Sequence, residues 1–248
     1  MVQLKYFGDS RDYFKYDLIT YLLRERLCAN YAFIPMLTNH RVDGEGNKTP
    51  KYIEGKSREL LSFIFRCELK DLNHWEQWLE PLVDSYVTLA PVNEIFFADQ
   101  SRREYWGTFE EISKIGNALI FVDPDTGLET GNAYYLKKMG REKYILNSEL
   151  SQLFERLEHG SVLMLYQHLT NNKHIHKESV DKKLVQASIH TGSQYVLAYR
   201  EDDLAFLFLL KSKQLFNQLY SMLNKYYQNS DHTYKSLHNI SNALAGEV

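Results

Sequence analysis

The fold is decided by residues 118–127, which read ALIFVDPDTG. Five apolar residues in succession, without polar alternation, are typical of a strand that is buried on both faces of a parallel sheet. The run stops at Asp123, and Pro124 and Gly127 then favour a turn. Residues 161–168 read SVLMLYQH and have the same form. Two such strands predict an α/β protein built around a central sheet.

Segments with helical periodicity alternate with the predicted strands. We expect helices over residues 12–27, 56–65, 73–85, 101–115, 143–157, 177–190 and 213–228, and further strands over 4–8, 31–37 and 92–98. Residues 194–199 and 204–210 flank a charged turn and predict an antiparallel hairpin. The sequence therefore predicts a three-layer α/β fold, with a mostly parallel, Rossmann-like sheet, helices on both faces and a C-terminal antiparallel hairpin.

The composition indicates one domain. A chain of 248 residues with 44% hydrophobic content can bury a substantial core, and no repeat or linker divides it. We expect a single domain over residues 1–248, with a polar tail from about residue 229. The apolar runs are too short for a membrane span, the N-terminus lacks a signal-peptide pattern, and Cys28 and Cys67 are isolated. These features predict a cytoplasmic protein that has no membrane partner. The composition leaves its oligomeric state open.

The net charge of −3 does not suggest a nucleic-acid partner, but a local basic stripe on a nearly neutral protein can still bind one. No glycine-rich phosphate loop and no nucleophile-elbow serine is present, which argues against a dinucleotide enzyme, an NTPase and an α/β-hydrolase. His174 and His176 form a His-x-His pair without a recognisable third ligand, so we interpret them as solvated.

Three loops at predicted strand ends carry the candidate chemistry, because strand ends in an open α/β sheet meet at the edge where ligands bind. The first loop, residues 7–17, contains Asp9, Arg11, Asp12 and Lys15. Helix capping accounts for one aspartate at this position, but less well for the whole set of charges.

The second loop, residues 123–129, places three carboxylates within seven residues. Neighbouring carboxylates repel, so one can hold a raised pKa and act as an acid while another stays ionised. The third loop follows the neighbouring strand at residues 166–172 and contains His168, a candidate proton donor. We expect the second and third loops to lie side by side.

The order of elements in the second half is similar to that of class I methyltransferases, and Asp123-Pro124-Asp125 resembles their Asp-Pro-Pro-Tyr loop. Residues 7–19 also resemble the N-terminal segment of ribosomal RNA adenine methyltransferases. However, the position of their glycine-rich S-adenosylmethionine loop reads LTNHR at residues 37–41, and position 125 is Asp with no following aromatic. Methyl transfer to nucleic acid is therefore kept as an alternative.

Three further signatures span most of the chain: YFGD at residues 6–9 followed by DYFKY at 12–16, DPDTG at 123–127, and YQH at 166–168. As a set they resemble bacterial anti-phage DNA glycosylases, which remove a glucosylated hydroxymethylcytosine from phage DNA. The resemblance implies an antiviral DNA glycosylase that hydrolyses the N-glycosidic bond of a modified cytosine. It implies DNA with a flipped base as partner, and neither a cofactor nor a metal.

The resemblance also implies roles for residues in the three loops. Cleavage builds positive charge on the sugar and negative charge on the departing base, which a carboxylate and a hydrogen-bond donor stabilise. The candidate catalytic residues are Asp123, Asp125, His168, Asp9 and Asp12. The candidate substrate- and DNA-binding residues are Arg11, Tyr13, Phe14, Lys15, Thr126, Glu129, Tyr166, Gln167, Arg102 and Arg103. A metal-dependent nuclease, holding Mg²⁺ through Asp9, Asp12, Asp123, Asp125 and Glu129, is a further alternative.

Overall fold

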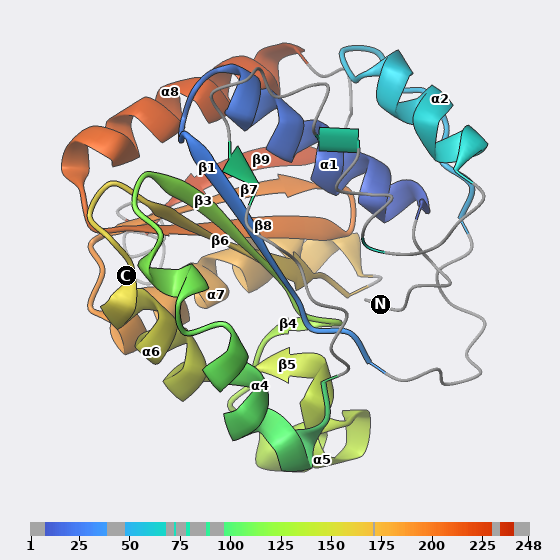
Figure 1. The fold of residues 1–248 in the computed structure, drawn as a ribbon. Helices are drawn as coiled ribbons and strands as arrows, with labels where there is room; N and C mark the ends of the chain where they lie inside the picture. Colours follow the sequence, from blue (N-terminus) through green and yellow to red (C-terminus); the bar gives the residue numbers. More distant parts are fainter. Residues whose placement is uncertain are drawn as a thin grey trace.

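The structure is a computed structural model that describes residues 8–38, 48–67, 72, 78–79, 88–89, 97–170, 172–229 and 234–240 (Figure 1). Residues 4–7 of the first predicted strand lie outside these ranges, as do most of the predicted helix over 73–85 and residues 92–96 of a predicted strand. No helix in the described part of the chain has the length and apolar character needed to cross a bilayer.

The centre of the molecule is a seven-stranded mixed sheet with the order β2-β1-β3-β6-β8-β7-β9 (Figure 1). Four neighbouring strands run parallel: β2 (Thr88–Leu89), β1 (Asn30–Pro35), β3 (Ala118–Asp123) and β6 (Val162–His168). Three follow with antiparallel pairing: β8 (Leu204–Leu210), β7 (Tyr195–Glu201) and β9 (Lys235–Asn239). The α/β class, the parallel core and the hairpin formed by β7 and β8 are thereby confirmed.

Helices cover both faces of the sheet, and the side chains of each strand alternate between two cores. Phe121 and Met164 face one core with α1 (Ser10–Arg24), α2 (Arg58–Arg66) and α8 (Lys213–Asn229). Val122 and Leu165 face the other, with α4 (Arg102–Thr108), α6 (Asn147–Arg156) and α7 (His176–Thr191) (Figure 1). The three-layer arrangement follows from these two cores.

A small insertion lies beyond the end of β3 (Figure 1). It contains a two-stranded sheet of β4 (Gly127–Leu128) and β5 (Tyr144–Ile145), with α5 (Ala133–Met139) and the 3-10 turn η4 (Arg141–Lys143) between them. The predicted helix over 143–157 therefore begins only at Asn147, because its first residues pair as a strand.

Two other segments differ from the sequence-based expectation. The helix predicted over 101–115 ends at Thr108, whose hydroxyl donates to the backbone oxygens of Glu104 and Tyr105, and the short 3-10 turn η3 (Ile112–Lys114) follows. The polar tail contains strand β9, in which His238 lies 2.7 Å from both Asp181 of α7 and Ser236 of its own strand. Arg200 of β7 also donates to Ser236, so β9 is fastened to two neighbouring elements.

Candidate functional site

The N-terminus of α1 lies at the carboxyl ends of β3 and β6, where it brings charged side chains onto the edge of the sheet. The Asp9 side chain accepts hydrogen bonds from the backbone N–H groups of Arg11 and Asp12, and so caps the helix. Asp12 in turn accepts from the N–H of Gly8 at 2.9 Å. With the helix start held in this way, Arg11 reaches β6 and Lys15 reaches β3.

Lys15 is the centre of a buried cluster that joins α1, β3 and β6. Its ammonium donates to Asp123 Oδ2 at 2.8 Å, lies 3.4 Å from Asp12 Oδ1, and sits 4.3 Å from the centroid of the Tyr166 ring. Burial alone would lower the pKa of Lys15, but the negative charges of Asp123 and Asp12 raise it above its ordinary value. Lys15 is therefore a charged group within the protein interior.

Two polar atoms of this cluster have no hydrogen-bond partner among the residues described by the structure: Asp123 Oδ1 and the Tyr166 hydroxyl. Asp123 is 3% exposed and Tyr166 is 1% exposed, so surface water does not satisfy either group. Burial raises the pKa of Asp123, although the charge of Lys15 opposes this, and burial likewise raises the pKa of Tyr166. Buried polar atoms normally have partners, so these two are the atoms that a bound water or substrate group would satisfy.

A second, more exposed cluster adjoins the first and consists of Arg11, His168 and Asp203. Arg11 Nη2 lies 2.9 Å from both His168 Nε2 and Asp203 Oδ2. Because a guanidinium only donates, His168 Nε2 acts as the acceptor, which places the imidazole proton on Nδ1. Burial alone would raise the pKa of Asp203, but the charge of Arg11 and its hydrogen bond bring the pKa well below its ordinary value.

The Asp9 carboxyl group has a pKa close to neutral pH. Burial and the nearby charge of Asp12 raise the pKa of Asp9 to about 6, against the opposing effects of a backbone hydrogen bond and of Lys15. A carboxyl group that titrates close to neutral pH is suited to acid–base chemistry. Asp9 therefore combines a capping role with a protonation state that changes near neutral pH.

The loops after β3 and β6 lie side by side, as expected from the sequence. The N–H of His168 donates to the backbone oxygen of Thr126 at 2.8 Å. The Gln167 amide also bridges them, since it accepts from the N–H of Leu128 and donates to Thr126 O. Gly127 has φ +129°, and a Cβ there would lie 2.4 Å from Gln167 Oε1. Gln167, predicted to contact substrate, thus has both ends of its amide occupied within the loops.

Asp125 belongs to a different pair from Asp123. Its Oδ2 lies 3.4 Å from the ammonium of Lys143, while the N–H of Thr126 donates to the backbone oxygen of Lys143. Glu129, further along the loop, accepts from the N–H of Asn147 at the start of α6. The carboxylates of this loop therefore point to three separate partners and do not form one cluster.

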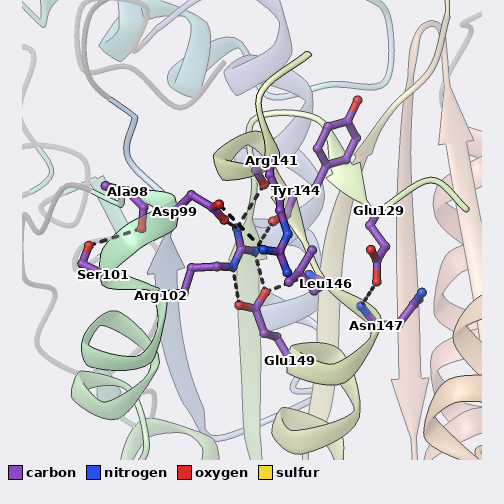
Figure 2. A network of polar contacts seen from close by, with 10 residues as sticks. All are labelled: Ala98, Asp99, Ser101, Arg102, Glu129, Arg141, Tyr144, Leu146, Asn147 and Glu149. Carbon is purple, nitrogen blue, oxygen red and sulfur yellow. Dashed lines mark hydrogen bonds and ion pairs between the residues drawn. The ribbon is translucent and has the colours of Figure 1, made fainter. Parts of the chain in front are cut away.

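Several predicted DNA-binding residues have structural positions instead. Arg102 is buried and uses all five of its N–H groups, on Glu149, Asp99 and the backbone oxygens of Tyr144 and Arg141 (Figure 2). A guanidinium bound in this way has no donor left for a phosphate, so this prediction was wrong. Arg103, its neighbour on α4, is exposed.

The predicted stacking residues Tyr13 and Phe14 are 1% and 7% exposed and belong to the core that contains α1. The Tyr13 hydroxyl donates to the backbone oxygen of Ser57. Because α1 is buried on most of its sides, its aromatic residues pack against the sheet and α2, and they have no surface to offer a base. Their predicted stacking role is corrected accordingly.

Asp203, Lys143 and His176 were missed or misinterpreted at the level of sequence. Asp203 lies in the turn between β7 and β8, and the antiparallel pairing of His168 with Leu204 brings that turn to the end of β6. The acidic run at residues 201–203 was the available signal. His176, interpreted as solvated, is buried, with its ring nitrogens 2.5 Å from Thr170 O and 3.2 Å from Arg200 Nη1.

The sequence matches no protein-family model and no curated protein. Among solved structures, the chain is similar to protein LPL1258 from Legionella pneumophila str. Philadelphia 1, which is described under the family model DUF519. The identity is 11% and the TM-score is 0.41, over 94% of this chain and 97% of that one.

Proposed function

We propose that the protein hydrolyses N-glycosidic bonds in DNA, with Asp123 as the central carboxylate. The observation that carries the proposal is the state of this side chain: one oxygen is held by Lys15 at 2.8 Å, and the other is buried without a partner in the described structure. A fixed carboxylate with one available oxygen is suited to stabilise the positive charge that develops on a sugar ring as its base departs.

Lys15 and Asp12 would act through Asp123. The ammonium holds the carboxylate in one orientation and favours its ionised form, against the effect of burial. In the proposed reaction, water adds to C1′ of the sugar, the bond from C1′ to the base nitrogen breaks, and a carboxylate takes up the proton that the water releases. The available oxygen of Asp123 would orient this water, and Asp9 is a second acceptor for its proton.

The departing base needs a donor, and His168 has the suitable tautomer. Its Nε2 accepts from Arg11, so Nδ1 carries the proton and can donate a hydrogen bond to a nitrogen or oxygen of the departing base, which leaves as an anion. The charge of Arg11 would stabilise the same developing negative charge. Asp203 fixes the guanidinium at 2.9 Å and so positions this pair.

The choice of a modified cytosine as the target base rests on the sequence resemblance alone. A protein site cannot reach the glycosidic bond of a stacked and paired nucleotide, so the nucleotide would have to leave the helix before cleavage. This substrate is part of the proposal, and antiviral defence is the corresponding role.

The test is an assay for abasic sites. Purified protein is incubated with single- and double-stranded oligonucleotides that carry cytosine, hydroxymethylcytosine or glucosylated hydroxymethylcytosine. The products are then treated with alkali, and the released base is identified by mass spectrometry. We expect strand breaks at the glucosylated position only. The absence of abasic sites on every substrate would overturn the proposal.

Two variants separate catalysis from folding. Asp123→Asn should lower the rate by about 10²–10⁴-fold, the usual contribution of a positioned acid–base group. Because this change leaves Lys15 buried with a weaker partner, His168→Gln at the partly exposed cluster serves as a second variant and should lower the rate about 10²-fold. Glu111→Gln, which removes a carboxylate from an exposed ion pair with Lys114, is the matched control.

One observation favours methyl transfer as a second candidate. In the sheet, β8 is antiparallel to both β6 and β7, so these two strands run in the same direction on either side of it. Class I methyltransferases close their sheets in the same way, and the predicted likeness therefore holds at the level of fold. Calorimetric titration with S-adenosylmethionine distinguishes the two functions, since only the methyltransferase should bind it.

A metal-dependent nuclease is less well supported. Within the described ranges, no three His, Cys, Asp or Glu side chains are grouped so as to hold a metal ion. The cation between Asp12 and Asp123 is the Lys15 ammonium, at 3.4 and 2.8 Å. Asp125 is paired with Lys143.

A further inference from the structure

Helix α5 is exposed to solvent along its whole length and carries two adjacent tyrosines. None of its residues is buried, and Tyr134 and Tyr135 are 73% and 49% exposed. Lys137 and Lys138 follow them, are exposed, and make no ion pair within the described structure. We call the surface formed by Tyr134, Tyr135, Lys137 and Lys138 the α5 patch. Exposed aromatic groups that add nothing to a core mark an interaction site.

The α5 patch is connected to the end of β3 and the loop that follows it, where Asp123 and Asp125 lie. Its helix leads through Gly140 into η4, where Lys143 pairs with Asp125 at 3.4 Å. Figure 1 shows α5 grouped with β4 and β5 beyond the end of β3. The α5 patch and Asp123 therefore belong to the same end of the central sheet.

The chemistry of the α5 patch complements a nucleic acid. Lysine ammonium groups bind backbone phosphates, and exposed tyrosine rings stack on bases of any sequence. The aromatic residues predicted for this task, Tyr13 and Phe14, are in the core and cannot perform it. An apolar protein partner would match the rings, but it would leave two ammonium groups opposite a surface without charge.

We propose that the α5 patch is the DNA-binding surface that delivers the substrate to the Asp123 site, with Lys137 and Lys138 on phosphates and Tyr134 stacked on a base. This inference rests on the proposed function, because it takes DNA as the substrate. It assigns binding to a helix outside the three loops on which the chemistry was predicted.

The experiment measures the affinity for short, fluorescently labelled, unmodified single- and double-stranded DNA by anisotropy at two salt concentrations. The charge-reversal variant Lys137→Glu/Lys138→Glu should bind at least about tenfold more weakly, and the slope of log affinity against log salt should fall by about one for each lost phosphate contact. Tyr134→Ala should weaken binding to the single strand by about tenfold, since stacking contributes most there.

The matched control is Tyr220→Ala/Lys225→Glu on α8, which removes one exposed tyrosine and reverses one exposed lysine far from α5 in Figure 1. The α5 residues are not buried, so the unfolding midpoints of these variants should equal that of the wild type. The proposal is overturned if the wild type binds neither DNA, if the patch variants bind like the wild type, or if the control weakens binding equally.

The same experiment keeps the two proposals apart. If the wild type binds DNA through the α5 patch but releases no base from any substrate, the patch is supported and the glycosylase function fails. If base release is observed but the patch variants keep their full affinity for DNA, the function is supported and the α5 patch is overturned.

Discussion

Helix α1 contributes side chains to two buried clusters, each of which contains a lysine, two carboxylates and a tyrosine. The two clusters differ in whether the tyrosine hydroxyl and the carboxylate oxygens have hydrogen-bond partners. Lys15 lies among Asp12, Asp123 and Tyr166, whereas Lys56 donates to Glu201 at 2.9 Å and to the Tyr226 hydroxyl at 2.7 Å, and lies 3.5 Å from Asp17 of α1. In the Lys56 cluster the tyrosine hydroxyl also donates to Asp17 at 2.6 Å. In the Lys15 cluster the tyrosine hydroxyl and one carboxylate oxygen have no partner in the described residues.

The polar atoms of the Lys56 cluster bind one another, whereas two polar atoms of the Lys15 cluster are left unsatisfied among the described residues. A buried polar network in which the groups bind one another stabilises a unique packing, as Lys56 does between α1, β7 and α8. A network with unsatisfied atoms costs stability, and it persists where another molecule completes it. The Arg102 network in Figure 2 belongs to the first class, because its five donors are all used.

The largest expected effect on stability comes from Lys56→Met. The substitution leaves Asp17 and Glu201 buried without their cation, and removing one partner of a buried ion pair costs about 3–5 kcal/mol. Urea denaturation should show this loss in the free energy of unfolding. Lys15→Met should cost about as much, because it leaves Asp123 buried with neither oxygen paired among the described residues. A Lys56→Met variant as stable as the wild type would contradict the structural role of that cluster.

The tyrosines give a sharper test. Tyr226→Phe removes a hydroxyl that bonds to Lys56 and Asp17, and should destabilise the protein by about 2 kcal/mol. Tyr166→Phe removes a hydroxyl without a partner in the described structure, and its effect should lie within about 0.5 kcal/mol of zero. Both values come from chemical denaturation at one pH. Equal losses would show that the Tyr166 hydroxyl is bound as firmly as that of Tyr226.

A smaller effect is expected at Asp9, where the pKa is raised from 3.8 to about 6. For a carboxyl group whose pKa is higher in the folded state, stability is greatest below pH 4 and falls as the pH rises through 6. Asp9→Asn should remove this fall while keeping the helix cap. We expect the variant to be more stable than the wild type at pH 7 by on the order of 1 kcal/mol, and equally stable at pH 4. Parallel stability curves from pH 4 to 7 would contradict this.

The sequence was sufficient to predict the parallel core and the shared edge, because residues 118–122 and 161–166 are mostly apolar runs, and the ends of neighbouring parallel strands meet at one edge of the sheet. It did not predict β4 and β5, since strands of two residues have no periodicity and depend on the side chain of Gln167. It placed Tyr13 and Phe14 at the site by their position in the chain, although α1 is buried on nearly all sides. The unsatisfied oxygen of Asp123 depends on the distances between α1, β3 and β6, and the order of residues along the chain does not contain these distances.

We propose that the Lys15 cluster carries the glycosidic chemistry and that the Lys56 cluster does not take part in it. Single-turnover rates of base release from glucosylated hydroxymethylcytosine DNA, measured for Asp123→Asn and Glu201→Gln at a temperature where both are folded, test it most directly. The account predicts a loss of about 10²-fold or more for Asp123→Asn and a rate within about twofold of wild type for Glu201→Gln. Equal rates in the two variants, or no base release by the wild type, would contradict it.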